Sequence, residues 1–256
     1  MAHNPICNVV WLGQEPYETA WKLQESLAEE IGAGKRPATL LLLEHPHTYT
    51  FGRRGEAKNL LWDADELMRR GIETFWVDRG GDVTYHGPGQ LVGYPLIPLG
   101  KPDPQTGNPA ITDYVGYLRK IETVLIWTLA RFGLGAGQIP GKTGVWIQPD
   151  VASRCVRCDP RLKLAPSKIA SIGVKVDVRG VTRHGFALNV APEMSYWEGI
   201  IPCGLEGVEM VSLADLLEPT PSLAEVKDRV SQVFGEVFGF EMNRMVQPFD
   251  SRSEIH

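Results

Sequence analysis

Short apolar runs separated by polar or glycine residues recur along the chain, and such runs are typical of buried strands. We expect strands at residues 9–12, 39–43, 73–77, 144–147, 168–176 and 181–190. A turn near Arg179-Gly180 joins the last two runs, which predicts that they pair antiparallel. The apolar run at residues 91–99 contains Pro95 and Pro98. Because proline lacks a backbone N–H, we expect an edge strand or a short strand there.

Longer segments with apolar residues at helical spacing lie between these runs. They predict helices at residues 16–31, 63–70, 111–132 and 222–238. Strands and helices therefore intermix, and this order favours an α/β (α+β) fold with a mixed, largely antiparallel sheet and flanking helices over a doubly wound parallel sheet. We expect a single domain over residues 1–256, with a core at about 8–217 and a C-terminal helix and tail at 218–256.

Composition and charge exclude several classes of protein. Of the 256 residues, 43% are hydrophobic and 22% charged, which is ordinary for a soluble globular protein. A net charge of −5 argues against a nucleic-acid-binding protein, which usually has a basic face. No apolar run is long enough to cross a bilayer, and the first residues lack the basic and apolar regions of a signal peptide. We therefore expect a cytoplasmic protein with no nucleic-acid or membrane partner.

The cysteines are too few for a disulfide framework, so we expect free thiols. They are Cys7, Cys155, Cys158 and Cys203. Cys203 lies between Pro202 and Gly204, on a turn that would fix the direction of its thiol. It could be a small buried hydrophobe or a nucleophile, and a nucleophile would need a nearby cation to ionise at neutral pH. Lys168 begins an expected strand and could be a solvated strand end or a desolvated cation beside such a thiol.

The densest concentration of glycine and polar residues is the stretch RGGDVTYHGPGQ at 79–90. Glycines in such a stretch let backbone amides approach a ligand closely. A binding loop and an elaborate structural turn both fit this composition. Neither GxGxxG nor GxxxxGK[ST] is present, so the stretch does not predict a nucleotide site.

Five ordered motifs resemble those of the lipoyl(octanoyl) transferases. They are RGGDVTYHGPGQLVGYPL (79–96), PGKTGVWI (140–147), KIASIGVKV (168–176), HGFALNV (184–190) and IPCGL (201–205). The similarity extends over roughly residues 9–217. It implies a fold similar to that of biotin and lipoate protein ligases. It also implies transfer of an octanoyl group from octanoyl-acyl carrier protein, through a cysteine thioester, to a lysine of lipoyl domains in lipoate biosynthesis. The acceptors would be the lipoyl domains of 2-oxoacid dehydrogenases and the glycine cleavage H protein.

The resemblance also implies roles for individual residues. Cys203 would carry the thioester, and Lys168 would make that thiol more acidic and act as acid and base. The acyl-substrate contacts would be Arg79, Gly80, Gly81, Asp82, Val83, Thr84, Tyr85, His86, Ser171, Ile172, Gly173, Gly185, Phe186 and Ala187. No cofactor or metal is expected, because the conversion of a thioester to an amide is downhill without ATP. N–H groups in glycine-rich turns near Gly173 or Gly204 could bind the oxyanion.

Three other functions fit parts of the pattern. An ATP-dependent lipoate or biotin-type protein ligase would need no nucleophilic cysteine, a non-catalytic acyl-binding protein would form no acyl-enzyme, and a thiol hydrolase would release free acid. Cys155 and Cys158 lie in a loop at 148–167 that is longer than expected of the family. They could be half of a four-ligand metal site, a redox pair or incidental, and only a chance of folding would bring His184 or Cys7 to complete a metal site. For the pair His45 and His47, a role in a binding loop or in the core is favoured over metal ligation.

Overall fold

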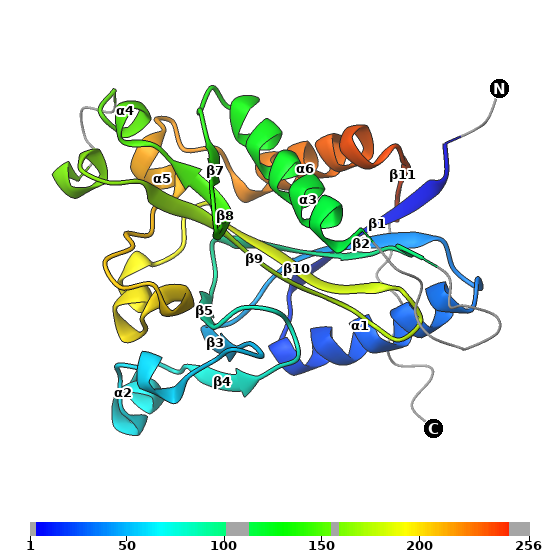
Figure 1. Ribbon diagram of the computed structural model, residues 1–256, viewed down its shortest axis with the longest axis horizontal. Coiled ribbons are helices and arrows are strands. Elements are labelled where there is room, and N and C mark those ends of the chain that lie inside the picture. The colour runs from blue at the N-terminus through cyan, green and yellow to red at the C-terminus, as the bar shows by residue number, and fades with distance from the viewer. Residues whose placement is uncertain (1–3, 101–112, 155–158, 246–256) are drawn as a thin grey trace.

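The computed structural model describes residues 4–100, 113–154 and 159–245, and its largest element is a mixed eight-stranded sheet (Figure 1). The strand order is β11-β1-β2-β6-β10-β9-β8-β7. Strand β1 runs parallel to both β11 and β2, and every other neighbouring pair is antiparallel. The bounds are β1 (Ile6–Gln14), β2 (Ala38–Glu44), β6 (Gln90–Leu96), β7 (Gly137–Ile139), β8 (Lys142–Ile147), β9 (Ser167–Val176), β10 (Thr182–Asn189) and β11 (Glu241–Arg244). The expected mixed, largely antiparallel sheet is confirmed.

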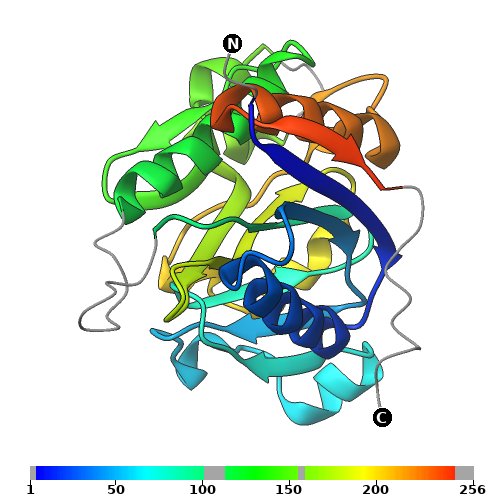
Figure 2. The ribbon, with the colours of Figure 1, turned by 90° about the vertical axis from the view of Figure 1, so that its right-hand side faces the viewer.

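Three long helices cover the two faces of this sheet. They are α1 (Tyr17–Gly32), α3 (Tyr114–Ala130) and α6 (Leu223–Phe238). Helices α3 and α6 lie side by side on one face, and α1 lies on the other (Figures 1 and 2). Strand β2 shows why both faces need cover: Leu40 and Leu42 pack under α3 and α6, while Leu41 and Leu43 pack under α1. Successive strand residues point to opposite faces, so a continuously apolar strand must be buried on both.

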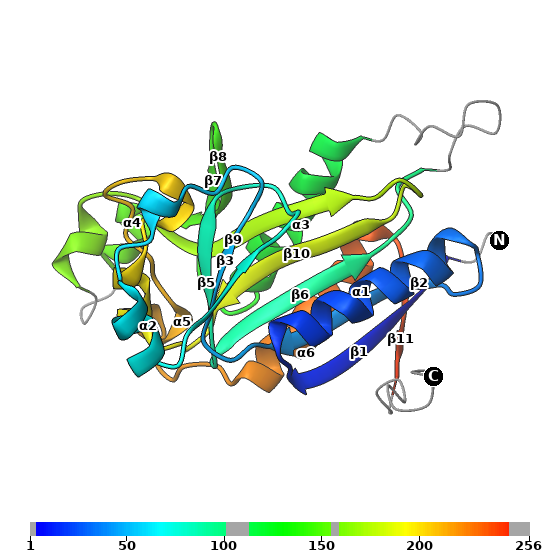
Figure 3. The same cartoon turned by 90° about the horizontal axis from the view of Figure 1, so that it is seen from below.

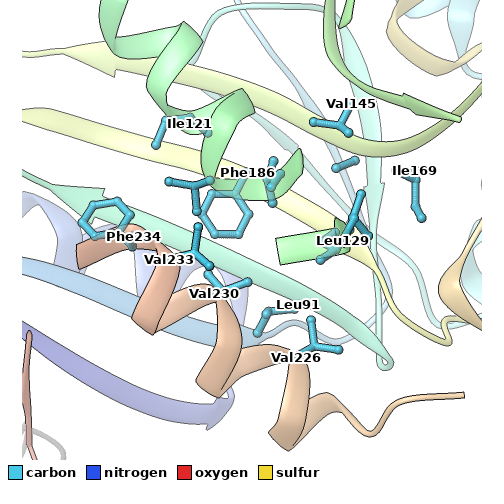
Figure 4. Packing of buried hydrophobic residues seen from close by; sticks show 14 of the residues in the cluster. Leu91, Ile121, Leu129, Val145, Ile169, Phe186, Val226, Val230, Val233 and Phe234 are labelled. Atoms are coloured by element: carbon cyan, nitrogen blue, oxygen red, sulfur yellow. The ribbon is translucent and has the colours of Figure 1, made fainter. Parts of the chain in front are cut away.

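The core beneath α3 and α6 contains most of the buried apolar side chains (Figure 4). Val226, Val230, Val233 and Phe234 of α6 belong to it and are fully buried. Helix α6 begins with a capping box in which Ser222 and Glu225 exchange side-chain and backbone hydrogen bonds. The C-terminal helix is therefore part of the main core. In the part of the chain that the structure describes, no helix is long and apolar enough to cross a membrane.

A second, smaller sheet lies beside the first, with the order β4-β3-β5. Its strands are β3 (Thr48–Phe51), β4 (Glu73–Trp76) and β5 (Val83–His86). It packs on an aromatic cluster that includes Tyr49, Tyr85 and Trp197. Strands β3 and β5 were not expected from the sequence, where β5 falls inside the glycine-rich motif. The remaining helices are short: η1 (Ala57–Asn59), α2 (Ala64–Arg69), α4 (Pro149–Ala152), η2 (Pro160–Lys163), η3 (Met194–Gly199), η4 (Pro202–Gly204) and α5 (Leu213–Leu216).

Strand β6 is short, as its prolines predicted, but the expectation of an edge position is wrong. It lies inside the sheet, between β2 and β10. Its pairing with β10 extends only from Gln90 to Gly93, so Pro95 lies beyond that ladder. Pro95 still contributes its carbonyl, which accepts a hydrogen bond of 2.6 Å from the Thr182 hydroxyl. A proline is tolerated in this interior strand because the ladder between β6 and β10 ends at Gly93, so no ladder hydrogen bond to β10 requires the missing N–H.

Candidate active site

Cys203 lies in the short helical turn η4, between the two sheets, and is partly exposed. Its backbone has φ 58° and ψ 18°, in the left-handed region that non-glycine residues rarely adopt. The turn is tied to the glycine-rich motif through Asn59, which accepts a 2.8 Å hydrogen bond from the Ile201 N–H and donates one of 2.5 Å to Asp82. A side chain at Gly204 would collide with the Asp82 carboxylate at 2.5 Å. These contacts hold the thiol in one direction.

Lys168 is buried and donates a hydrogen bond of 3.1 Å from its Nζ to the Sγ of Cys203. The same ammonium lies 5.5 Å from the centre of the buried Trp146 ring, a cation–π contact. Gly144 makes room for it: with φ 131°, a Cβ there would lie 2.5 Å from Cε of Lys168. Among the described residues no carboxylate forms an ion pair with Lys168. The motifs KIAS and IPCGL, 35 residues apart, thus meet as a lysine–cysteine pair.

A pocket beside Cys203 extends between β5 and the strands β9 and β10. Its lining includes Cys203 and most of the expected substrate contacts: Arg79, Gly81, Asp82, Thr84, His86, Ser171, Ile172, Gly173, Gly185, Phe186 and Ala187. Figure 3 shows β9 and β10 running side by side past the second sheet. Gly173 pairs with Gly185 across these strands, and a Cβ at Gly185 would lie 2.0 Å from the carbonyl oxygen of Gly93. Glycine at 185 is therefore required by close packing of the strands.

Three expected contacts do not line the pocket, namely Gly80, Val83 and Tyr85. Strand β5 explains two of them, because successive side chains point to opposite faces of a strand. Thr84 and His86 face the pocket, whereas Val83 and Tyr85 face the aromatic cluster of the small sheet. The Tyr85 hydroxyl is hydrogen-bonded to His47 at 2.8 Å, which fixes this orientation.

Arg79 is a second buried cation of the pocket. Its guanidinium donates to the carbonyl of Thr50 at 2.6 Å, to the Thr50 hydroxyl at 2.9 Å and to the carbonyl of Gly80 at 3.0 Å. Burial lowers the pKa of Arg79, while the nearby Tyr17 and Cys203 act in the opposite direction. Because its partners are neutral oxygens, its charge stays available to an anion in the pocket.

Three pocket residues were not expected from the sequence: Tyr17, Tyr94 and His184. His184 stands directly before the GFA triplet, and that position within HGFALNV was the available signal. Its Nε2 contacts Asp78 at 2.7 Å, and its backbone has φ 56°. Burial would raise the pKa of Asp78, but hydrogen bonds from His184 and Lys175 hold it well below its usual range. Tyr94 lies in the apolar end of the 79–96 motif and Tyr17 lies outside every motif, and no role was expected for either from the sequence.

Two buried hydroxyls that line the pocket, those of Thr84 and Ser171, have no hydrogen-bond partner among the described residues. Buried polar groups are rarely left unpaired, so both are suited to a polar group of a ligand. The two glycines whose N–H groups were expected to bind the oxyanion do not lie in open glycine-rich turns. The N–H of Gly204 donates to the carbonyl of Ile201 at 3.0 Å, and Gly173 lies inside β9 instead of in a turn.

Other polar residues singled out in the sequence have structural partners. His45 is buried between the carbonyl of Glu15 and the hydroxyl of Tyr94, both at 2.7 Å. His47 stacks on Tyr196. In the part of the chain that the structure describes, no group of three or more His, Cys, Asp or Glu could hold a metal ion. The Cys155–Cys158 pair lies outside the described residues.

Comparison with known proteins assigns this chain to a family. The catalytic-domain family of the lipoyl protein ligases A and B matches residues 16–235. A curated octanoyltransferase from Chloroflexus aurantiacus is 41% identical over 233 residues, which cover 91% of this chain and 94% of that protein. The chain belongs to the octanoyltransferase family. An octanoyltransferase from Solibacter usitatus is 42% identical over 92% of this chain and 94% of its own length. The resemblance inferred from the motifs is confirmed.

Solved structures confirm the fold of this octanoyltransferase family member. A bipartite lipoate protein ligase from Thermoplasma acidophilum superposes with a TM-score of 0.66 at 16% identity, over 96% of this chain and 89% of that one. A lipoate-protein ligase A bound with ATP gives a TM-score of 0.64, also at 16% identity, over 95% and 90% of the two chains. At such identity the likeness concerns the fold alone, and it confirms the expected similarity to lipoate protein ligases.

Proposed function

We propose that the protein transfers an octanoyl group from octanoyl-acyl carrier protein to a lysine of a lipoyl domain, through a thioester on Cys203. The observation that carries the proposal is the 3.1 Å contact between Lys168 and Cys203, in a family whose curated members are octanoyltransferases. A thiol becomes an effective nucleophile as the thiolate, and a buried ammonium in contact stabilises that anion. Lys168 has no competing carboxylate among the described residues, so its charge acts on the sulfur.

In the first half of the reaction the Cys203 sulfur bonds to the acyl carbon, and the bond from that carbon to the carrier's sulfur breaks. The departing thiolate takes a proton from the Lys168 ammonium, which becomes a neutral amine. In the second half the amine of the acceptor lysine bonds to the same carbon and the Cys203 sulfur leaves as a thiolate. Lys168 accepts the proton that the new amide nitrogen loses. The pair thereby returns to its starting charges, and no nucleotide is consumed.

The pocket supplies the other groups that this chemistry requires. Thr84 and Ser171 line the pocket with unpartnered hydroxyls that would donate to the acyl oxygen, and the charge of Arg79 would favour the oxyanion. Ala187 and the ring carbons of Tyr17 and Tyr94 give the acyl chain apolar surface. Burying about seven methylene-like groups contributes on the order of 5 kcal/mol at ~0.8 kcal/mol each.

The partners follow from the same chemistry. The donor would be octanoyl-acyl carrier protein, and the acceptors would be lipoyl domains of 2-oxoacid dehydrogenases and the glycine cleavage H protein. A reaction that depends on a reduced thiol fits the cytoplasm, where thiols are kept reduced. We therefore propose a cytoplasmic enzyme of lipoate biosynthesis.

The deciding experiment is intact-protein mass spectrometry after incubation with octanoyl-acyl carrier protein, without ATP, on the wild type and on Cys203→Ala. We expect one octanoyl mass on the wild type and none on the variant. Addition of a lipoyl domain is then expected to remove the mass from the enzyme and place it on the acceptor. An adduct on both proteins would mean that another residue is the nucleophile. No adduct on either, together with ATP-dependent use of free octanoate, would identify a ligase.

A further inference from the structure

The far end of the acyl pocket is closed by aromatic side chains for which no role was expected from the sequence. Strands β9 and β10 set its direction. Lys168, beside Cys203, lies five residues before Gly173 on β9, and Gly173 pairs with Gly185 of β10. At about 3.3 Å per residue these positions are roughly 16 Å apart along the strand. An extended octanoyl chain, with seven C–C bonds of about 1.5 Å in a zigzag, spans roughly 9 Å, so it fits within this stretch.

Tyr17, Tyr94 and His184 gather at the end of the pocket that is remote from the sulfur. His184 immediately precedes Gly185, and Tyr94 immediately follows Gly93, the partner of Phe186 on the neighbouring strand. Tyr17, the first residue of α1, contacts Nδ1 of His184 through its hydroxyl at 3.5 Å. The beginning of α1 lies beside the small sheet (Figure 1), where Tyr17 contacts Phe75 of β4 and lines the pocket.

The Tyr17 ring is held rigidly from several sides. It is 1% exposed and stacks on Phe75 of β4 at 5.3 Å and on His86 at 5.9 Å between ring centres. His45 lies 5.0 Å away on another side. A ring enclosed in this way cannot swing aside without opening the packing between α1 and the small sheet.

The hydroxyls of Tyr17 and Tyr94 point to imidazoles. The carbon atoms of their rings therefore form the surface that the end of an acyl chain would contact. Tyr94 is bonded to Nε2 of His45 at 2.7 Å, and Tyr17 contacts His184. Burial lowers the pKa of His45 to about 4 and keeps that of His184 below its usual value. Both imidazoles are therefore neutral at pH 7, which suits an apolar chain end better than charged groups would.

We infer that Tyr17, supported by Tyr94, is the floor that limits the acyl chain to medium length, and that it sets the chain-length specificity of the transfer. The inference rests on the proposed function, because it assumes that the pocket holds the acyl chain of the Cys203 thioester. Removing the ring in Tyr17→Ala would join the pocket to the space now filled between Phe75 and His45. Longer chains would then gain buried methylene groups that the wild type excludes.

The test is a competition among equimolar octanoyl-, decanoyl- and dodecanoyl-acyl carrier protein, with the adducts on Cys203 quantified by intact-protein mass spectrometry. The wild type is expected to carry mainly the octanoyl mass. Tyr17→Ala is expected to shift the ratio of decanoyl to octanoyl adduct by roughly tenfold or more, since each newly buried methylene is worth about fourfold. Tyr17→Phe keeps the ring and is expected to keep the wild-type ratio. Leu27→Ala truncates another buried side chain of α1, outside the pocket lining, and is expected to keep that ratio too.

Each result bears on a distinct claim. If Tyr17→Ala folds and keeps the wild-type ratio of adducts, Tyr17 does not limit the length of the acyl chain. The same conclusion follows if the wild type accepts dodecanoyl as readily as octanoyl. A wild type that forms no adduct with any donor overturns the proposed function itself. If circular dichroism shows that Tyr17→Ala does not fold, Tyr17→Leu and Tyr94→Leu remove less volume. They are then expected to give a smaller shift in the same direction, and no shift in either would overturn the inference.

Discussion

Two buried cations lie near the sulfur of Cys203, and within the described residues neither is paired with a carboxylate. Lys168 contacts the sulfur itself, and Arg79 is held by neutral oxygens of Thr50 and Gly80. Burying an unpaired charge costs free energy, so keeping two of them in this pocket lowers the stability of the fold. In the proposed mechanism, the two charges supply a preorganised positive potential where a thiolate and then an oxyanion form.

Lys168→Met should separate that electrostatic role from a structural one. Methionine fills similar space without a charge, so the free energy of unfolding is expected to stay level or rise. The transfer rate is expected to fall by about 10² or more, because acid–base help and thiolate stabilisation are both lost. Transfer assays and urea unfolding measure the two effects. Lys142→Met is the matched control: that lysine is exposed on β8, 5.6 Å from the same Trp146 ring, and its loss should leave the rate unchanged. Near-normal transfer by Lys168→Met would rule out the proposed role.

Sequence reasoning reached the motif residues to which the family resemblance assigns a role, and it missed Tyr17, Tyr94 and His184. Lys168 and Cys203 were expected together through the resemblance, and the structure brings them into contact. Tyr17 is an apolar-face residue of a helix, and nothing local distinguishes it from a core tyrosine. Its place in the pocket depends on how α1 packs against β10 and the small sheet, which is a long-range property of the fold.

At the scale of elements, strand periodicity decides which motif residues can touch a ligand. The run 79–86 was expected as one set of contacts, but part of it is a strand, so its residues alternate between pocket and aromatic core. The glycines at 80 and 81 masked that strand, because glycine-rich sequence is typical of loops. Strand β11 was missed for another reason. Its sequence EMNR has no apolar run, and the segment is a strand because it pairs with β1.

Gly144 of β8 shows how an element makes space for the side chain of Lys168. We expect Gly144→Ala to lower the free energy of unfolding by about 1–3 kcal/mol, because φ 131° disfavours alanine. The new Cβ would also lie 2.5 Å from Lys168 and 2.7 Å from the carbonyl oxygen of Ala170, so transfer should fall as well. Gly137→Ala on the neighbouring β7, where a Cβ meets nothing within 4 Å, should change neither. Urea unfolding and the transfer assay compare the two variants, and equal losses would contradict this account.

For the molecule as a whole, the sequence was enough to predict the mixed sheet and the helices α1, α2, α3 and α6 in their order, because the apolar periodicity of each element is local. The four-residue helices α4 and α5 were not predicted. It was not enough to predict that a second sheet of three strands forms one wall of the pocket. Strand β3 is four residues long and fully buried, and its partners are set by the chain's return through β4 and β5. Such pairings depend on distant contacts that a single sequence does not display.

Three buried imidazoles should make the stability of the whole molecule sensitive to acid. Burial lowers the pKa of His45 to about 4 and also lowers those of His86 and His184. The unfolded chain binds protons at these sites below about pH 6.5, while the folded chain does not, so stability falls as the pH falls through that range. His45 alone should account for about 2 kcal/mol between pH 7 and pH 5.

Urea unfolding at the two pH values tests this expectation. His45→Gln should lose less stability on acidification than the wild type. His47→Gln, which removes a less buried imidazole, should behave more like the wild type. A wild type whose stability is the same at pH 7 and pH 5 would contradict the assignment of neutral buried imidazoles.

The pairing of β1 with β11 also has a consequence for how the protein is made. Asn8 and Asn243, joined across these strands by a 2.9 Å hydrogen bond, are 235 residues apart in the chain. At a synthesis rate of about 5–20 residues per second, β11 is made on the order of tens of seconds after β1. During that time its outer edge can bind other chains, as open strand edges do. The outer edge of β1 is thus exposed to misassociation during synthesis, on the opposite side of the sheet from Lys168 of β9.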